Sequence, residues 1–276
     1  MSRIRQILNS GFKFKHKLGQ NFIYDTNLLN SIAAQSDIDG AVVLEIGAGP
    51  GTLTQALAAR ADKVIAYEID SELINPLEEN LSGLTNVTII NKDFMKVSER
   101  EISDLTGGAF GVVANLPYYI TTPVIMKFIE SALPVKSMTL MVQKEVADRL
   151  IALPGTPEYG AITLSVDISA NVKSVKNIRR NLFYPVPNVD STLIKIDIDR
   201  EKYDIKYYAI LKKLIKSAFS MRRKTLVNNI TKDFNITKER AAELINGAGI
   251  DIRARGETLN TPEFIRLSEA LGRILC

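Results

Sequence analysis

A glycine-rich turn, Gly47-Ala48-Gly49-Pro50-Gly51, follows a run of apolar residues that ends at Ile46. Glycines let a ligand approach the backbone closely, and the start of a following helix offers free N–H groups. The Gly-x-Gly-x-Gly spacing differs from the Gly-x-Gly-x-x-Gly of dinucleotide enzymes, and no Gly-Lys-Ser/Thr follows, so a P-loop is excluded. The turn, with Gly47 and Gly49 as candidate ligand contacts, indicates a nucleotide site that needs no phosphate, or else a tight structural turn.

Two carboxylates follow the next two predicted strands, Glu68 and Asp93. Glu68 lies about 20 residues beyond the glycine turn, where an acidic side chain binds ribose hydroxyls in such folds and repels phosphate. Asp93 is suited to accept a hydrogen bond from an adenine amino group. Either residue alone is more typical of an exposed loop or a helix cap. Together they favour S-adenosylmethionine over a dinucleotide, because this cofactor has a ribose and an adenine but no phosphate.

A fourth predicted strand runs into Asn115-Leu116-Pro117-Tyr118. An adenine amine is a weak nucleophile because its lone pair is drawn into the ring. Acceptors bonded to its hydrogens favour the positive charge that grows on nitrogen during attack on a methyl group. The Asn115 side-chain oxygen and the Leu116 carbonyl can be these acceptors, and Tyr118 can stack on an extruded base. In the alternative reading, Pro117 simply ends a strand.

Strands and helices that could position these residues alternate from about residue 26 to residue 152. The expected strands are 41–46, 64–69, 87–91, 110–114 and 138–142, and the expected helices are 27–35, 53–60, 71–81, 122–132 and 144–152. This alternation predicts an α/β fold with a doubly wound, Rossmann-like parallel sheet. Two later strand-like runs, 161–168 and 191–198, predict an antiparallel edge.

The chain after Tyr207 has a helical pattern throughout. The expected helices are 208–219, 224–230, 238–246 and 262–274. We therefore predict three parts: a basic N-terminal segment over the cofactor site (1–25), a cofactor-binding catalytic domain (26–200) and a helical RNA-binding domain (201–276).

Composition removes several classes of protein. The 276 residues are 46% apolar and 24% charged, as is typical of globular domains. A single cysteine, Cys276, and a single histidine, His16, exclude a disulfide within the chain and a zinc site of the Cys/His type. No apolar run approaches the roughly 18 residues that cross a bilayer, and no secretory signal is present. We expect a cytoplasmic protein that binds neither metal nor membrane.

Positive charge is concentrated at the two ends of the chain. Residues 1–20 carry 5 basic and 0 acidic side chains, residues 21–198 carry 14 and 21, and residues 199–276 carry 16 and 10. Such a split suggests a polyanionic partner, although a basic patch is often only a solvated surface. We expect Arg222, Arg223 and Lys224, at a helix start, to contact RNA phosphates together with Lys212 and Lys213. Lys13, Lys15, His16 and Lys17 suggest a segment that orders over the site.

The sequence resembles the ribosomal RNA adenine dimethyltransferases of the KsgA type, which are related to the Erm methyltransferases. The resemblance runs nearly end to end and is carried by six ordered blocks, which are Leu18-Gly19-Gln20-Asn21-Phe22, Gly47 to Gly51, Asn115 to Tyr118, Gln143-Lys144-Glu145-Val146-Ala147, Phe183 to Ser191 and Phe219 to Leu226. The family's usual Pro-Lys-Val-Asp-Ser appears as Pro187-Asn188-Val189-Asp190-Ser191, which puts a basic role at this position in doubt.

The resemblance implies a class I methyltransferase sheet and assigns roles to single residues. It implies that Asn21, Ile23, Gly47, Glu68, Asp93 and Asn115 bind S-adenosylmethionine, and that Asn115, Tyr118 and Phe183 surround the target adenine. Phe183 could also be a core residue, which is the commoner fate of phenylalanine, but the prolines that follow it favour a wall on which a base stacks.

The family implies dimethylation of two neighbouring adenosines in small-subunit ribosomal RNA, on a maturing subunit, by a monomeric enzyme. Three alternatives remain at this point. One is an Erm-like enzyme that modifies large-subunit RNA, and another is an assembly factor whose methylation is secondary. A DNA adenine methyltransferase is the third, although the second proline of its Asn-Pro-Pro-Tyr motif is Leu116 here.

Overall fold

The computed structural model describes residues 14–221 and 223–275. The chain divides into two compact units. Of the described residues, the first unit contains those up to Ala147 together with Val172–Ile198, and the second contains Asp148–Asn171 and those from Asp199 onward. Asp199 lies beside our predicted boundary at residue 201. Asp148–Asn171, which we expected in the catalytic domain, has most of its contacts within the second unit.

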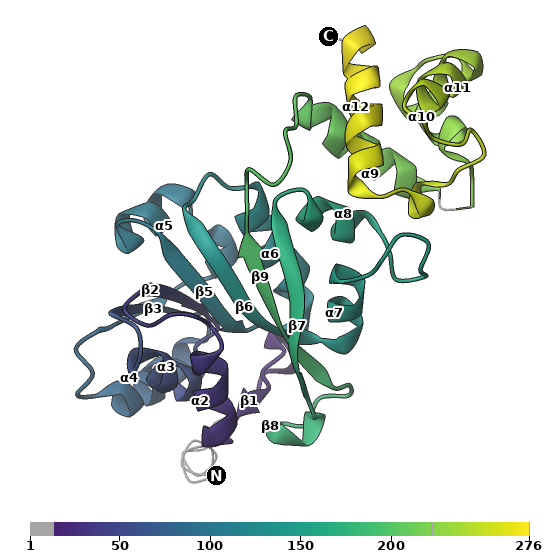
Figure 1. The fold of residues 1–276 in the computed structure, drawn as a ribbon. Helices are drawn as coiled ribbons and strands as arrows, with labels where there is room; N and C mark the ends of the chain where they lie inside the picture. Colours follow the sequence, from purple (N-terminus) through teal and green to yellow (C-terminus); the bar gives the residue numbers. More distant parts are fainter. Residues whose placement is uncertain (1–13, 222, 276) are drawn as a thin grey trace. The chain divides into compact units, whose positions relative to one another are not determined.

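A seven-stranded sheet forms the centre of the first unit (Figure 1). Its strands, in spatial order, are β4 (Val87–Asn91), β3 (Lys63–Glu68), β2 (Val42–Ile46), β5 (Phe110–Asn115), β6 (Val135–Gln143), β9 (Ser191–Ile198) and β7 (Ala170–Ile178). The first five strands pair in parallel, and β9 pairs with β6 antiparallel. The predicted Rossmann-like sheet with an antiparallel edge is therefore confirmed.

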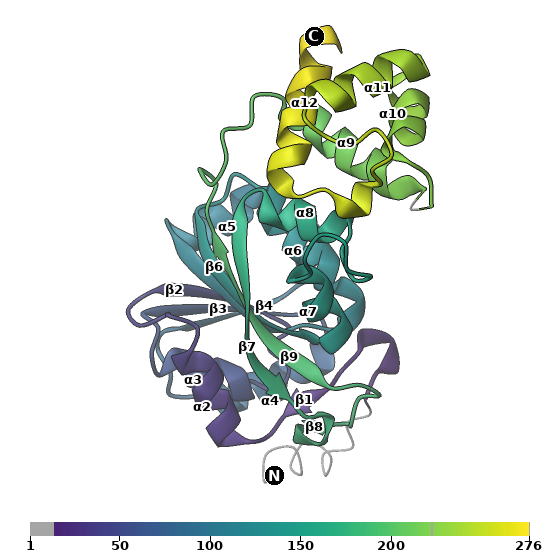
Figure 2. The same cartoon turned by 45° about the vertical axis from the view of Figure 1, so that its right-hand side comes forward.

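Helices cover both faces of this sheet (Figures 1 and 2). Around the sheet lie α2 (Thr26–Ala34), α3 (Thr52–Ala58), α4 (Ile74–Leu81), α5 (Glu99–Thr106), α6 (Thr121–Glu130) and α7 (Lys144–Leu150). Leu29 and Leu57 of α2 and α3 pack in one core with Val43 and Val113 of the sheet. On the other face, Phe128 of α6 contacts Phe110. Because the strand order reverses between β2 and β5, a crevice opens at their carboxyl ends.

Two elements differ from the sequence expectations in their type. The run 161–168, predicted as a strand, is the helix α8 (Ala161–Asp167), because Leu164 and Ile168 lie one helical turn apart and pack into the core of the second unit. β7 was not predicted. Its apolar residues Val172, Val175 and Ile178 recur every third position, which hides the period of two that marks a strand.

A short helix was also missed between β4 and β5. Ser98 caps α5 by accepting a hydrogen bond from the Glu101 N–H at 3.2 Å, and Ile102 is the fully buried residue of this helix. The segment Glu99–Thr106 is so polar that its apolar face is hardly visible in the sequence.

The second unit is helical and has its own core. It contains α8, α9 (Tyr208–Ser220), α10 (Leu226–Phe234), α11 (Lys238–Gly247) and α12 (Thr261–Leu275). Leu214, Ile230, Ile245 and Phe264 are at most 2% exposed and belong to a single apolar cluster. Within the described part of the chain, no helix is both long and apolar enough to cross a membrane.

Candidate active site at the carboxyl ends of the strands

The glycine turn has a backbone that needs glycine at three places. Gly47, Gly49 and Gly51 have φ angles of +76°, +56° and +82°, in the left-handed region that side chains disfavour. A Cβ atom at Gly49 would lie 2.9 Å from the Phe22 ring. The turn is pinned to β3, since the N–H groups of Gly47 and Ala48 donate to the Tyr67 carbonyl at 2.8 and 3.0 Å.

Glu68 joins the end of β3 to this turn. One carboxylate oxygen accepts from the Gly49 N–H at 2.7 Å, and the other accepts from the Asp70 N–H at 2.8 Å. The side chain is buried, and this burial raises the pKa of Glu68 although the backbone hydrogen bonds oppose the rise. A carboxylate has about four lone-pair sites, so Glu68 can still accept a hydrogen bond from a ligand.

Asp93 caps a single 3₁₀ turn after β4. One of its oxygens accepts from the Met95 N–H at 3.0 Å, and the other lies 3.8 Å from the Lys96 ammonium. The helix-cap reading of Asp93 is thus part of its role. It also lines a cavity, and its role in binding a ligand stays a prediction.

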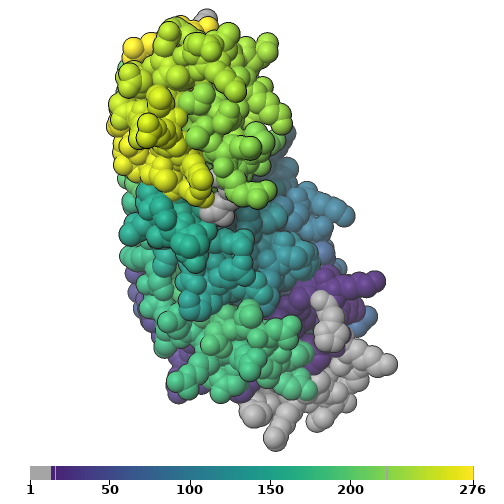
Figure 3. All heavy atoms as spheres, turned by 90° about the vertical axis from the view of Figure 1, so that its right-hand side faces the viewer, coloured from purple at the N-terminus to yellow at the C-terminus, as the bar shows by residue number. Residues whose placement is uncertain are grey.

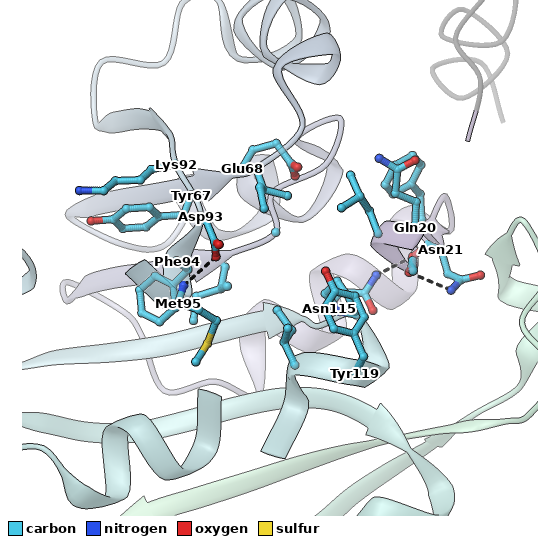
Figure 4. A pocket seen from close by; sticks show the side chains of 18 residues that line it. Gln20, Asn21, Tyr67, Glu68, Lys92, Asp93, Phe94, Met95, Asn115 and Tyr119 are labelled. Atoms are coloured by element: carbon cyan, nitrogen blue, oxygen red, sulfur yellow. Dashed lines mark hydrogen bonds between the residues drawn. The ribbon is translucent and has the colours of Figure 1, made fainter. Parts of the chain in front are cut away.

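This first cavity collects most of the residues that we predicted to bind a cofactor. It has a volume of about 190 Å³ and is lined by Asn21, Gly47, Glu68, Asp93 and Asn115 (Figure 4). Tyr67, Phe94 and Met95 add an apolar wall. Gly49 and Ile23 are not part of the lining. Gly49 acts here through its N–H on Glu68.

The tetrapeptide that begins at the last residue of β5 contributes to this cavity and to a second one. Asn115 and Pro117 line the first cavity, whereas Tyr118 lines the second. The Asn115 Nδ2 group donates to the Asn21 carbonyl at 2.7 Å, so the side-chain oxygen of Asn115 points away from that carbonyl. The Tyr118 hydroxyl lies 3.2 Å from the Ser191 hydroxyl. The Leu116 side chain is buried, so only its backbone can act as we predicted.

The second cavity measures about 390 Å³, and part of its wall comes from the segment after β8 (Phe183–Tyr184). Pro185, Val186, Pro187 and Asn188 face Phe14 and Tyr118 across it, with Gln143 from the end of β6. On the face seen in Figure 3, the green chain that follows β8 lies beside the purple N-terminal segment. Gly19, Gln20 and Asn21 line both cavities, so one segment forms the wall between them.

Phe183 and Ile23 occupy positions different from those that we expected. They pair across the antiparallel strands β1 (Phe22–Ile23) and β8 (Phe183–Tyr184), and both side chains are 2% exposed in the core below α2 and α3. The core reading of Phe183 therefore describes this structure, and its ring does not line either cavity. The neighbouring Tyr184 is exposed, and its ring lies 5.4 Å from that of Phe14.

The sequence did not reveal how the N-terminal segment is held. The carboxylate of Asp70 is buried and accepts from Lys15 Nζ at 2.6 Å and from Gln20 Nε2 at 2.7 Å. Burial alone raises the pKa of Asp70, but these hydrogen bonds outweigh it and lower the pKa. Glu72 also pairs with Lys15, at 3.0 Å. The only signal in the sequence was an acid two residues beyond Glu68.

The basic cluster does not start a helix. α10 begins at Leu226 after Thr225, so Arg223 and Lys224 lie in the connection that precedes it, and the helix start predicted at Lys224 was wrong. Arg222 and Lys13 lie outside the described residues. Lys212 and Lys213 belong to α9, and their ammonium groups lie 5.8 Å and 4.5 Å from the rings of Tyr208 and Phe234.

Comparisons with known proteins find relatives that match nearly the whole chain. A family model described as ribosomal RNA adenine dimethylase matches residues 11–272. The ribosomal RNA small subunit methyltransferase A of Clostridioides difficile (strain 630) is 44% identical over 264 residues, which cover 94% of this chain and 91% of the relative. That of Bacillus mycoides (strain KBAB4) is 43% identical over 270 residues, covering 95% and 92%.

Two solved structures share the fold over most of the chain. A dimethyladenosine transferase from Plasmodium falciparum has a TM-score of 0.77 at 26% identity, covering 89% of this chain and 95% of that one. The 23S rRNA methyltransferase ErmE has a TM-score of 0.71 at 26% identity, covering 91% and 99%.

Proposed function

The chain belongs to the ribosomal RNA adenine dimethylase family and is a ribosomal RNA methyltransferase, and from this premise we propose its reaction in detail. It transfers methyl groups from S-adenosylmethionine to the exocyclic amines of two adjacent adenosines in small-subunit ribosomal RNA. The observation that carries the proposal is the pair of cavities. They share the wall Gly19–Asn21, and the tetrapeptide from Asn115 to Tyr118 contributes to both.

The first cavity fits S-adenosylmethionine. Glu68 offers a buried carboxylate for ribose hydroxyls, Asp93 offers one for the adenine amine, and Phe94 and Met95 offer an apolar surface for the purine. Asn21, Gly47 and Asn115 complete the set, and Gly49 holds Glu68 in place. Ile23 supports the segment from beneath rather than touching the cofactor. When bound, this cofactor supplies an electrophilic methyl group.

The second cavity is the place for the target adenine. Tyr118 offers a ring on which the base stacks, and the exposed Tyr184 is better placed than Phe183 to assist at the rim. The Asn115 side-chain oxygen and the Leu116 carbonyl accept the two amine hydrogens. They stabilise the positive charge that develops as the N–C bond forms. The product ammonium is acidic enough to lose its proton to water, so these residues need no general base.

The remaining parts of the proposal concern the partner. Arg222, Arg223 and Lys224 contact phosphates of the ribosomal RNA, and Lys212 and Lys213 add positive charge on α9. The enzyme acts as a monomer on a maturing small subunit in the cytoplasm.

The test is mass spectrometry of ribosomal RNA from small and large subunits of cells that lack the gene, after incubation with the protein and S-adenosylmethionine. We expect dimethyladenosine at two adjacent positions of small-subunit RNA. If only large-subunit RNA is methylated, the proposal is contradicted. That result favours an Erm-like activity, the alternative suggested by the structural similarity to ErmE.

A further inference from the structure

Gln143 is the last residue of β6, and its side chain lines the second cavity. Four residues with side-chain amides line this cavity, Gln20, Asn21, Gln143 and Asn188, and the amides of the first two are already engaged. The Gln20 amide bonds to Asp70 and to the Lys15 N–H, and the Asn21 amide donates to the Gly19 carbonyl at 3.1 Å. Within residues 14–221 and 223–275, the Gln143 amide has no hydrogen-bond partner. It is therefore available to a ligand.

The register of the sheet directs this amide toward the reacting groups. β5 and β6 are parallel, and Asn115 lies beside Met141, so Gln143 projects from the same face two residues further along. On its other side, Gln143 pairs with Ser191, whose hydroxyl lies 3.2 Å from that of Tyr118. Three neighbouring strands thus bring Asn115, Gln143 and the Ser191–Tyr118 pair to one edge.

The chemistry of adenine indicates what the amide does there. Once Asn115 and Leu116 accept both hydrogens of the amine, the polar atoms that remain on the base are ring nitrogens with lone pairs. N7 accepts a hydrogen bond in both purines, so N1 is the ring nitrogen that distinguishes adenine from guanine. The Gln143 NH₂ group is a donor and complements such an atom, whereas the protonated N1 of guanine does not accept.

We propose that Gln143 is a specificity-determining residue that donates a hydrogen bond from Nε2 to N1 of the target adenine. This inference rests on the proposed function, because it takes the second cavity as the site of the base. If the wrong base binds, the polar group of the site is left without a hydrogen-bond partner, and this cost discriminates strongly against that base.

The experiment combines Gln143→Met with altered bases. Small subunits are reconstituted with RNA that carries adenosine, 1-deazaadenosine or 7-deazaadenosine at the target positions, and kcat/KM for methyl transfer is measured. Both analogues keep the reactive amine. We expect the wild type to lose about 10-fold with the analogue that lacks the accepting nitrogen. Gln143→Met should lose about 10-fold with adenosine and nothing further with that same analogue.

Gln143→Glu keeps the size and polarity of the side chain and serves if Gln143→Met does not fold. The carboxylate of Gln143→Glu turns a lone pair toward the ring nitrogen. The decrease in kcat/KM with adenosine should therefore be larger for Gln143→Glu than for Gln143→Met. Asn171→Leu is the control, because it removes an exposed amide outside both cavities and should retain the wild-type ranking of the three bases.

Equal rates for Gln143→Met and the wild type with adenosine overturn the inference. A loss that multiplies with both analogues also overturns it, because it places Gln143 in contact with something other than the base. Failure of the proposed function looks different. In that case the wild type transfers no methyl group to adenosine in these subunits.

Discussion

Glu68 is the residue on which the cofactor assignment depends most directly. Its carboxylate faces the first cavity while two backbone N–H groups hold it. If it binds ribose hydroxyls, Glu68→Ala should weaken S-adenosylmethionine binding by about 1.5 to 3 kcal/mol, the worth of hydrogen bonds to a charged group. Calorimetry measures this, and circular dichroism checks the fold. An unchanged affinity in a folded variant rules out the assignment.

Asn115 tests catalysis separately from binding. Asn115→Ala removes one of the two acceptors that act mainly in the transition state, so methyl transfer should fall about 10² to 10³-fold, by analogy with the deletion of an oxyanion-hole donor. RNA affinity should hardly change. The variant also loses the hydrogen bond to the Asn21 carbonyl, so cofactor affinity is measured beside the rate. A rate near that of the wild type excludes Asn115 from the reaction.

Glu45 provides a prediction about pH. This residue of β2 is fully buried, and burial raises its pKa to about 8, with the charge of Glu68 acting in the same direction. The folded state therefore keeps a proton that the unfolded state releases near its ordinary pKa of 4.5. The free energy of unfolding should fall as the pH rises from about 4.5 to 8. In urea titrations, Glu45→Gln should lack this component. An identical pH dependence for both proteins contradicts the prediction.

Single residues at strand ends were the part of the site that the sequence could predict. Glu68, Asp93 and Asn115 follow consecutive strands, and parallel strands bring their carboxyl ends to one edge. Asp70 with Lys15 and Gln20 could not be found in this way, because the hydrogen bonds join residues 55 and 50 positions apart. The prolines near Phe183 suggested exposure, whereas its side chain is buried in one core with Ile23.

At the scale of elements, the segment that separates the two cavities depends on the Lys15–Asp70 ion pair. Lys15→Met should weaken S-adenosylmethionine binding several-fold, because Asn21 and Phe22 of this segment line the first cavity. Lys17→Met is the control, since Lys17 is exposed in the same segment. Because the pKa of Asp70 is lowered, the pair is present at neutral pH and is lost as the pH falls through that pKa.

The two variants of the segment also separate this role from RNA binding. If Lys15 served only as a phosphate contact, Lys15→Met would weaken RNA binding and leave cofactor affinity unchanged. Equal cofactor affinity for Lys15→Met, Lys17→Met and the wild type therefore contradicts the prediction.

Elements were predictable where their period was clear and their packing was local. The five parallel strands and the helices α9, α11 and α12 lie within a few residues of the expected ranges. α8 and β7 were not predictable. The apolar residues of the helix α8 alternate as they do in a strand, and those of the edge strand β7 recur every third position, which is closer to a helical period. In α8 the core of the second unit decided the outcome.

At the scale of the whole molecule, the net charge of +4 hides an uneven distribution of charge. The helical part, residues 199–276, carries 16 basic and 10 acidic side chains. This excess has no counterpart in residues 21–198, where acids outnumber bases by 21 to 14. Long-range attraction of RNA depends on such a field, whereas a tight grip needs particular cations near phosphates. A comparison of variants with equal net charge separates the two effects.

Arg222, Arg223 and Lys224 are the cations that we expect to make those contacts. Arg223 and Lys224 precede Thr225, the N-cap residue of α10. They therefore lie outside this helix and are not needed to begin it. Replacing all three with glutamine should leave cofactor binding intact and weaken RNA binding without regard to sequence. The slope of log affinity against log salt should become shallower by up to about 2 to 3 units.

The control replaces Lys96, Arg100 and Lys136, three exposed cations of the first unit, and removes the same charge. If the field alone attracts RNA, both triple variants should weaken binding equally and change the salt slope equally. If the cluster contacts phosphates, only its own variant should lower the slope, because counterions are released only where a cation neutralises a phosphate. An unaltered slope in the cluster variant means that RNA is held elsewhere, with Lys173, Lys176, Arg179 and Arg180 as the next cations to replace.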